Sequence, residues 1–243
     1  MVRIQSIVSN APPRIETAYM KVGDSQSWLP AFMTAFGNPG LGYNLGTHTE
    51  LEATVQWFLA SHVPIGPANE STTRTQWVLG KETLLRVPAT IVPSPLQQAI
   101  AENPRYAVIM YGTNPDDTLE LYEANMRQIV AECVAAGVIP ILTTVPYRPV
   151  INLPPSPGEG AVSNAIVRRV AEDNSIPLVD LRRETDLLPS RGISGDQLHL
   201  SVAGTGPGDL TPAGLQGGHN TRNFLTLQAL ARTKLAREGI ASP

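Results

Sequence analysis

The sequence predicts an α/β protein in which helices cover a parallel β-sheet. Short, almost continuous apolar segments recur along the chain, as is typical of parallel strands buried on both faces. They lie at 19–22, 106–111, 138–144 and 176–179. Longer segments between them carry apolar residues at three- and four-residue steps, the spacing of amphipathic helices. Strands that alternate with helices along a chain indicate this layered architecture.

The clearest helical pattern covers 117–136, where apolar residues repeat on one face and Gly137 follows at the position of a helix-ending glycine. A second helix is expected over about 160–173, with Val162 among the residues that face the core. A third is expected over about 221–238, near the end of the chain. These three helices supply apolar faces that can cover the predicted sheet.

Two segments have little periodicity and many turn-forming residues. The stretch 61–95 contains five prolines, and the stretch 203–218 contains six glycines and two prolines. Both are expected to run across the surface as long connections. No repeat and no low-complexity linker divides the 243 residues, so we expect one domain spanning 1–243.

Composition excludes several classes of partner and bond. The net charge of −3 gives no basic footprint for nucleic acid. The longest apolar stretch, 134–145, is interrupted by Gly137 and Pro140 and is too short to span a bilayer.

Cys133 is the single cysteine, so no intramolecular disulfide can form. The segment 1–6 has no apolar core of a signal peptide, so the protein is either cytoplasmic or exported by a leader outside this sequence. The oligomeric state cannot be predicted.

Polar residues follow two of the expected strands. Ser25 comes directly after the strand 19–22, in Gly23-Asp24-Ser25, and Asn114 follows the strand 106–111, in Gly112-Thr113-Asn114. In an open parallel sheet, ligands bind beyond the carboxyl ends of the strands. These two turns are therefore expected to lie at one edge of the sheet and to form part of a site.

A histidine base for a serine nucleophile is suggested by a third segment. Of the four histidines, only His199 has a carboxylate three residues earlier, at Asp196. On a tight turn this spacing lets the carboxylate accept from Nδ1–H and leaves Nε2 free for a serine. Each element also has a structural explanation: Asp24 and Ser25 can cap a helix, and Asn114 can be an N-cap ahead of Pro115.

The order of the three elements resembles that of the SGNH (GDSL-type) hydrolase superfamily. Lys21–Ser25 is similar to its block I, Met110–Asn114 to its block III and Gly195–His199 to its block V. The resemblance implies a three-layer αβα, flavodoxin-like fold and a catalytic triad of Ser25, His199 and Asp196. It also implies an oxyanion hole made by the Ser25 N–H, the Asn114 side chain and a block II glycine.

The sequence departs from the family pattern in three places. Gln26 follows the nucleophile where the family has an apolar residue, and Asp116 takes the place of the family's block III aspartate one position late. Block II matches poorly. Gly80 is preferred as its glycine because it lies between blocks I and III in the chain, and Gly46 is the alternative.

The function implied is that of a serine esterase, with no cofactor and no metal, which cleaves short acyl esters or acetylated carbohydrate through an acyl-enzyme. An acyltransferase with the same triad and a non-catalytic SGNH-fold binding module are the alternatives. A metal-dependent phosphoesterase using Asp24, Asp116 and His199 is disfavoured by the small number of histidines. The resemblance favours export of the protein. The aromatic residues that could line a sugar or acyl site, or simply pack in the core, are Trp28, Trp57, Trp77 and Tyr147.

Overall fold

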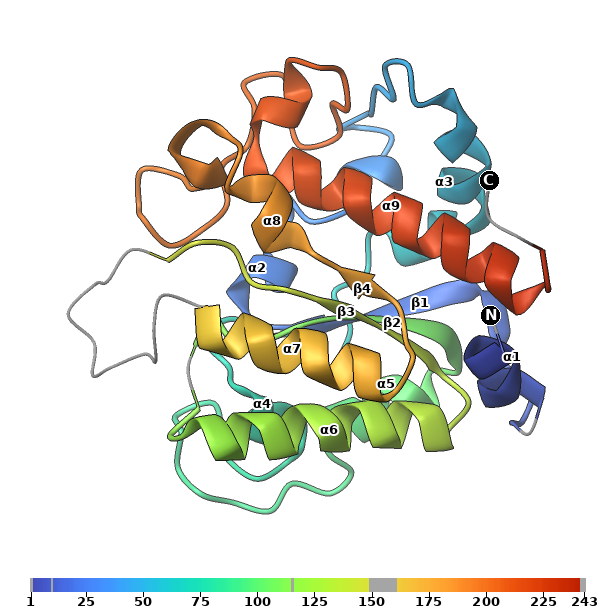
Figure 1. Ribbon diagram of the computed structural model, residues 1–243, viewed down its shortest axis with the longest axis vertical. Coiled ribbons are helices and arrows are strands. Elements are labelled where there is room, and N and C mark those ends of the chain that lie inside the picture. Colours follow the sequence, from blue (N-terminus) through green and yellow to red (C-terminus); the bar gives the residue numbers. More distant parts are fainter. Residues whose placement is uncertain (1, 10, 115, 149–160, 241–243) are drawn as a thin grey trace.

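A four-stranded parallel sheet in the order β1-β2-β3-β4 forms the centre of the protein (Figure 1). The computed structural model describes residues 2–9, 11–114, 116–148 and 161–240. The strands are β1 (Ile15–Gly23), β2 (Pro104–Met110), β3 (Ile139–Thr143) and β4 (Leu178–Val179). The four predicted strands are thus confirmed, although β1 begins earlier than expected and β4 is shorter.

Helices cover both faces of the sheet, as predicted for a three-layer αβα fold. Figure 1 shows α6 (Leu119–Ala135) and α7 (Ala161–Asp173) side by side on one face, and α9 (Gly218–Arg237) on the other. The shorter helices are α1 (Val2–Ser9), α2 (Ser25–Trp28), α3 (Glu52–Trp57), α4 (Thr75–Val78), α5 (Pro95–Ala101) and α8 (Leu181–Thr185). None of the helices in the described ranges is long and apolar enough to cross a membrane.

The core forms where the apolar strands meet the inner helix faces. Every residue of β2 and β3 is buried, which explains their continuous apolar sequences. Met126, Ile129 and Val130 of α6 pack against this core, as the helical pattern predicted. Val162 of α7 is 39% exposed, so the prediction that it faces the core was wrong. It lies in the first turn of α7, before the buried stripe of that helix begins.

The connection 61–95 has little regular structure, as predicted, apart from α4 and the ends of a 3-10 turn at Leu59–Ser61 and of α5. The prediction that it runs across the surface was wrong for much of its length, since 73–75 and 77–80 are buried. The further 3-10 turns are Thr34–Phe36, Thr49–Leu51, Pro189–Gly192 and Gly214–Gln216. No periodic pattern in the sequence predicts α1, α3, α4, α5 or α8. Helices of one or two turns carry too few apolar positions to give a clear period.

The segment 68–70 completes the sheet next to β1. Gly23 pairs with Met110 of β2 and also forms an isolated parallel bridge with Asn69. The Gly23 N–H donates to Ala68 O, and the Glu70 N–H donates to Gly23 O, both at 3.2 Å. The end of β1 therefore lies between two backbone segments, with little space around Gly23.

Replacing Gly23 by alanine is expected to lower the free energy of unfolding by about 1–3 kcal/mol, the usual cost of overpacking a core. A Cβ added at Gly23 would lie 2.7 Å from the Met110 carbonyl oxygen and 2.4 Å from Ser27 Oγ. Because one of these contacts is with backbone, a rotamer change cannot relieve it. Thermal unfolding should show a Tm several degrees lower.

Gly204→Ala is the matched control, since a Cβ there would meet nothing within 4 Å. Its Tm is expected to stay within about 1 °C of the unmodified protein, as for most surface substitutions. Equal melting temperatures for Gly23→Ala and Gly204→Ala would show that the space around Gly23 is not as restricted as the geometry indicates.

Candidate active site

The carboxyl ends of the strands bring together the three motifs found in the sequence. Ser25 is the first residue of α2, directly after β1, and Asn114 lies four residues beyond the end of β2. His199 lies on the loop that leads toward α9. Figure 1 shows α2 at the end of the sheet where β1 stops, on the side of the long loops that precede α9.

Ser25, His199 and Asp196 form one hydrogen-bonded chain. Ser25 Oγ lies 3.1 Å from His199 Nε2. On the other side of the ring, His199 Nδ1 lies 2.7 Å from Asp196 Oδ2. With the proton on Nδ1, the ring donates to the carboxylate and its Nε2 lone pair accepts from the serine hydroxyl. The Ser25 side chain is buried, whereas His199 and Asp196 remain partly open to solvent.

The Asp196 carboxylate is held by a tight turn. Its Oδ1 accepts hydrogen bonds from Ser194 Oγ at 2.6 Å and from the Leu198 and His199 N–H groups at 2.9 Å. Gln197 adopts the left-handed conformation, with φ of 59°, that closes this turn. Burial raises the pKa of Asp196, but the hydrogen bonds outweigh it and hold that pKa well below its ordinary value. The carboxylate is therefore ionised beside the imidazole.

Gln26 links the serine turn to the histidine loop. Its Nε2 donates to Leu198 O at 2.8 Å, and its Oε1 accepts from the Leu200 N–H at 3.2 Å. The two bonds hold the backbone on either side of His199, and the Gln26 side chain is fully buried. The sequence analysis noted Gln26 only as a departure from the family pattern. The only sign of its role in the sequence was that Gln26 is polar at a position where the family has an apolar residue.

Asp24 is the N-cap of α2, so the structural explanation for this residue is correct. Its Oδ1 accepts from the Gln26 N–H at 3.1 Å. Burial raises the pKa of Asp24 to about 6, although the hydrogen bond from Gln26 and the charge of Arg222 favour the ionised form. The cap fixes the first turn of α2, and Ser25 starts that turn. Capping by Asp24 is therefore compatible with a nucleophilic role for Ser25.

Arg222 supports the serine turn from the last helix. It is fully buried and donates to Gln26 O at 2.6 Å and to Ser27 Oγ at 2.7 Å. Its guanidinium also stacks 3.7 Å from the centre of the Phe32 ring. The sequence analysis missed Arg222, and the signal for it was a charged residue within the apolar pattern of the C-terminal helix. A buried arginine is costly unless its N–H groups find partners, and here the backbone after Ser25 supplies one.

Asn114 does not cap a helix. The helix after it, α6, begins at Leu119, and its N-cap is Thr118, whose Oγ accepts from the Leu121 N–H at 3.1 Å. The alternative explanation of Asn114 as an N-cap was therefore wrong. Instead, Asn114 Nδ2 donates to Thr73 O at 3.1 Å. This bond uses one amide hydrogen and leaves the other available to a ligand.

The predicted block II glycines have other roles in the structure. The Gly80 N–H donates to Trp77 O at 2.9 Å, and the Gly46 N–H donates to Asn44 Oδ1 at 3.0 Å. Neither N–H is free to bind a substrate oxygen, so the choice of Gly80, with Gly46 as its alternative, was wrong. Gly80 has a positive φ of 70° and lies against Ile91 O at the end of α4.

The segment 68–74 lies between the serine turn and the loop that carries Asn114. It contacts β1 through the Gly23–Asn69 bridge and Asn114 through Thr73 O. Asn69 Nδ2 donates to Ser27 O at 2.9 Å and so reaches the serine turn as well. The search for a glycine could not find this segment, because it contains none.

A buried network joins this segment to the loop that carries Asn114. Asp116 Oδ2 accepts from Thr75 Oγ at 2.5 Å, and Thr75 Oγ accepts from Asn125 Nδ2 of α6 at 2.8 Å. Burial raises the pKa of Asp116 to about 6, despite the hydrogen bond from Thr75. Asp116 therefore holds the loop in place, as expected for a residue that replaces the family's block III aspartate.

Two cavities lie beside the loop that carries His199. A hollow of about 530 Å³ is lined by Tyr147, Arg191 and residues on either side of Asp196, among them Ser194 and Gln197. A much smaller space of about 10 Å³ is lined by Gly112, Val145 and Leu198, the residue before His199. Tyr147 lines both spaces.

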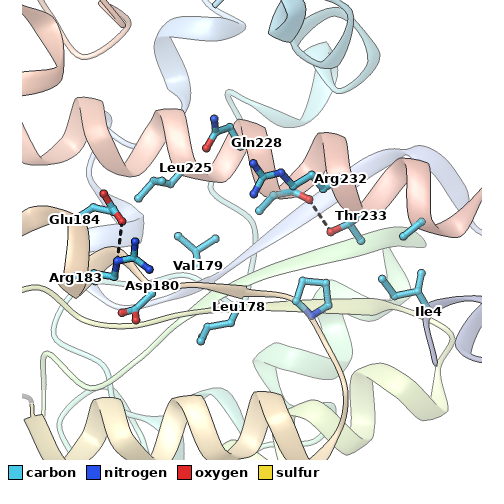
Figure 2. Close-up of a pocket in the computed structure, with 13 residues that line it drawn as sticks. Ile4, Leu178, Val179, Asp180, Arg183, Glu184, Leu225, Gln228, Arg232 and Thr233 are labelled. Atoms are coloured by element: carbon cyan, nitrogen blue, oxygen red, sulfur yellow. Dashed lines mark hydrogen bonds and ion pairs between the residues drawn. The ribbon is translucent and has the colours of Figure 1, made fainter. Parts of the chain in front are cut away.

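A third cavity, of about 440 Å³, lies away from these residues, between the edge strand β4 and α9. Figure 2 shows Leu178 and Val179 of β4 facing Leu225 and Arg232 of α9, with Arg183 paired to Glu184 at the rim. None of the residues that line it belongs to the three motifs. This cavity is therefore not assigned to the site around Ser25.

The described residues include no group of three histidine, cysteine or acidic side chains that could hold a metal ion. Asp24, Asp116 and His199, the set considered for a metal-dependent phosphoesterase, each have different partners. Asp24 caps α2, Asp116 accepts from Thr75, and His199 contacts Ser25 and Asp196. The arrangement supports nucleophilic chemistry by Ser25 and offers no metal site in this part of the chain.

Solved structures with the same fold are esterases and acylhydrolases. The acetylxylan esterase Axe2 from Geobacillus stearothermophilus is 18% identical, with a TM-score of 0.55 over 90% of this chain and 96% of that chain. A lipase/acylhydrolase from Enterococcus faecalis is 15% identical, with a TM-score of 0.56 over 89% and 95% of the two chains. At these identities the similarity establishes the fold.

No curated protein matches the sequence significantly. The model of the GDSL-like Lipase/Acylhydrolase family, in contrast, matches residues 68–205, which include Asn114, Asp196 and His199. Ser25 lies before the matched range, but it is hydrogen-bonded to His199 within it. The family match, the fold and the order of the motifs agree, and the chain belongs to the GDSL-like lipase/acylhydrolase family of ester-hydrolysing enzymes.

Proposed function

We propose that this protein is a serine esterase that hydrolyses short acyl esters, including those of acetylated carbohydrate, through an acyl-enzyme. The observation that carries the proposal is the hydrogen-bonded chain from Ser25 through His199 to Asp196. A serine hydroxyl is a weak nucleophile until a neighbouring base takes its proton. His199 is in reach of that proton, and Asp196 holds the imidazole in the tautomer that can accept it.

In the first half of the reaction, Ser25 Oγ attacks the ester carbonyl carbon as its proton moves to His199 Nε2. The carbonyl oxygen becomes negatively charged, and Asp196 stabilises the imidazolium. His199 then gives the proton to the leaving alcohol, and the C–O bond to that alcohol breaks. Ser25 now carries the acyl group.

In the second half, water attacks the acyl-enzyme. His199 takes a proton from the water and returns it to Ser25 Oγ, which leaves as the carboxylic acid forms. Asp196 remains ionised throughout, since its hydrogen bonds hold its pKa well below the ordinary value. The serine and the histidine thus return to their starting protonation states.

Two N–H donors are proposed for the oxyanion. The Ser25 N–H is at the start of α2, where helical N–H groups have no partner within the helix. In the part of the chain that the structure describes, it has no acceptor. The second donor is the remaining hydrogen of Asn114 Nδ2.

The size of the small space favours a short acyl group. Its volume of about 10 Å³ is close to that of one water-sized probe, so an acetyl methyl fits better than a long chain. The larger hollow beside the histidine loop, about 530 Å³, is in the range of cavities that bind small ligands. It is proposed to hold the alcohol part of the ester.

Ser25→Ala is expected to abolish ester hydrolysis while leaving the Tm nearly unchanged, because the hydroxyl contributes little to packing. Turnover of p-nitrophenyl acetate should fall to below about a hundredth of that of the unmodified enzyme. A fluorophosphonate probe should label the unmodified enzyme and not the variant. Labelling of both proteins would mean that another residue is the nucleophile.

Asp196→Asn is expected to lower kcat by up to about 10⁴, because the amide favours the wrong imidazole tautomer. The hydrogen bonds that hold the pKa of Asp196 low keep its carboxylate ionised in the unmodified enzyme. Measured kcat on p-nitrophenyl acetate tests the expectation, and an unchanged Tm would show that the fold is retained. A kcat equal to that of the unmodified enzyme would contradict the role of Asp196.

Asn114→Ala and Asn114→Asp are each expected to lower kcat by about 10²–10³, the usual cost of removing one oxyanion donor. The aspartate should be no better than the alanine, because it places negative charge where negative charge develops. Measured kcat and Tm for both variants test this expectation.

Thr118→Ala is the matched control, since Thr118 is the actual N-cap of α6. It should cost about 1 kcal/mol of stability and leave kcat nearly unchanged. An Asn114→Asp enzyme with full activity would remove Asn114 from the oxyanion hole.

A further inference from the structure

Two arginines that line the cavities beside the histidine loop, Arg148 and Arg191, have no carboxylate partner among the described residues. Many arginines elsewhere are paired, as Arg168 is with Asp180 at 2.8 Å. The protein has a net charge of −3, so this positive charge is a local feature and does not reflect the composition.

The Arg191 side chain is held against an aromatic ring. It lines the hollow of about 530 Å³, and its guanidinium stacks 4.1 Å from the centre of the Tyr147 ring. Ser190 and Arg191 are both left-handed, with φ of 49° and 53°. Such backbone strain in consecutive non-glycine residues tends to occur at functional sites. The ring holds the cation at the wall of the cavity and leaves its N–H edges available to a ligand.

Arg148 adds positive charge next to Tyr147. It lines the small space beside Gly112 and donates a hydrogen bond to Thr113 O. Burial lowers the pKa of Arg148, and the charge of Asp24 opposes this effect. A third arginine, Arg182, also faces Tyr147, but it is paired with Asp186 at 2.7 Å.

The acidic groups near these two arginines are already engaged. Asp24 caps α2 and Asp196 binds His199. Among the described residues, no carboxylate is paired with Arg148 or Arg191, so an anionic group of a ligand can bind them without displacing a protein carboxylate.

The position of the hollow indicates which part of the substrate it binds. In the proposed reaction His199 donates its proton to the leaving alcohol, so that alcohol must lie on the His199 side of the site. The loop that carries Asp196 and leads to His199 also forms the wall of the hollow, through Ser194, Gly195 and Gln197. The small space next to Gly112 is a separate cavity that shares Tyr147 with the hollow.

We propose that Arg191 binds a carboxylate on the alcohol part of the ester, as in an O-acetylated sugar acid, and that Arg148 adds positive charge nearby. A guanidinium pairs with a carboxylate through two parallel N–H bonds. This inference rests on the proposed esterase function and narrows its substrate class to acidic esters.

The test compares one ester in two charge states. O-acetylated oligogalacturonate is assayed beside the same oligosaccharide with its carboxyl groups methyl-esterified, which removes the charge and leaves the acetyl esters in place. The free acid is expected to have a kcat/KM about tenfold higher, mainly through KM, as for one hydrogen bond to a charged group. The preference should shrink as salt is added. Equal kcat/KM values for the two forms would overturn the inference.

Arg191→Gln should reduce the ratio of the two kcat/KM values to near one, and Arg191→Lys should retain part of it because the charge remains. Arg232→Gln is the matched control, since it removes the same charge at the separate cavity between β4 and α9. Its ratio should equal that of the unmodified enzyme. An unchanged ratio in Arg191→Gln would show that Arg191 does not bind the carboxylate.

Sugar binding by the Ser25→Ala variant tests the acidic subsite independently of ester hydrolysis. Titration calorimetry of that variant with oligogalacturonate and with a neutral xylo-oligosaccharide of equal length requires no hydrolysis. Tighter binding of the acidic sugar, by about tenfold, is expected. If the unmodified enzyme cleaves p-nitrophenyl acetate but Ser25→Ala binds both sugars equally, the acidic subsite is wrong and the esterase stands. If nothing is cleaved but the acidic sugar is preferred, the esterase is wrong and the subsite stands.

Discussion

Two hydrogen bonds from the Gln26 side chain determine whether the serine and the histidine meet. Ser25 and His199 are 174 positions apart in the chain, and Gln26 joins their two segments by binding the backbone at Leu198 and Leu200. A fully buried amide with both ends paired has one favoured orientation. Within the histidine loop, Ile193 and Leu200 form an antiparallel bridge, and the Ser194 N–H donates to His199 O at 2.8 Å. The Gln26 link ties this loop to the serine turn and so restricts the distance between the two side chains.

The surroundings of the serine turn are more polar than a typical core. Asp24 and Arg222 are fully buried next to it, and Lys21, at 3% exposure, donates to Phe32 O and His62 O. Each of these groups loses hydration when the protein folds, and backbone carbonyls supply much of the compensation. Such a network resists small displacements, because moving the serine turn would leave a buried charged or polar group without a partner.

The sequence predicted the parts of this protein that follow from local pattern. The strands were visible as apolar segments, and the rule that sites lie at the carboxyl ends of parallel strands singled out Ser25 and Asn114. The spacing of Asp196 and His199 indicated their contact, because three residues on a turn bring the side chains together. The roles of Gln26 and Arg222 depend on contacts between distant segments, which no local pattern records. The segment 68–74 was missed because its position beside β1 depends on backbone pairing and not on a glycine.

The support that the last helix gives to the serine turn has a consequence for the nascent chain. Arg222 of α9 binds the backbone after Ser25. Because Ser25 is near the start of this sequence, it emerges from the ribosome long before α9 is synthesised. With 174 positions between Ser25 and His199, translation at about 5–20 residues per second separates their emergence by about 10–35 s. During this interval the growing polypeptide contains Ser25 without the His199 side chain that contacts it in the folded protein. A polypeptide released before α9 is made would hold its serine turn without the bonds from Arg222.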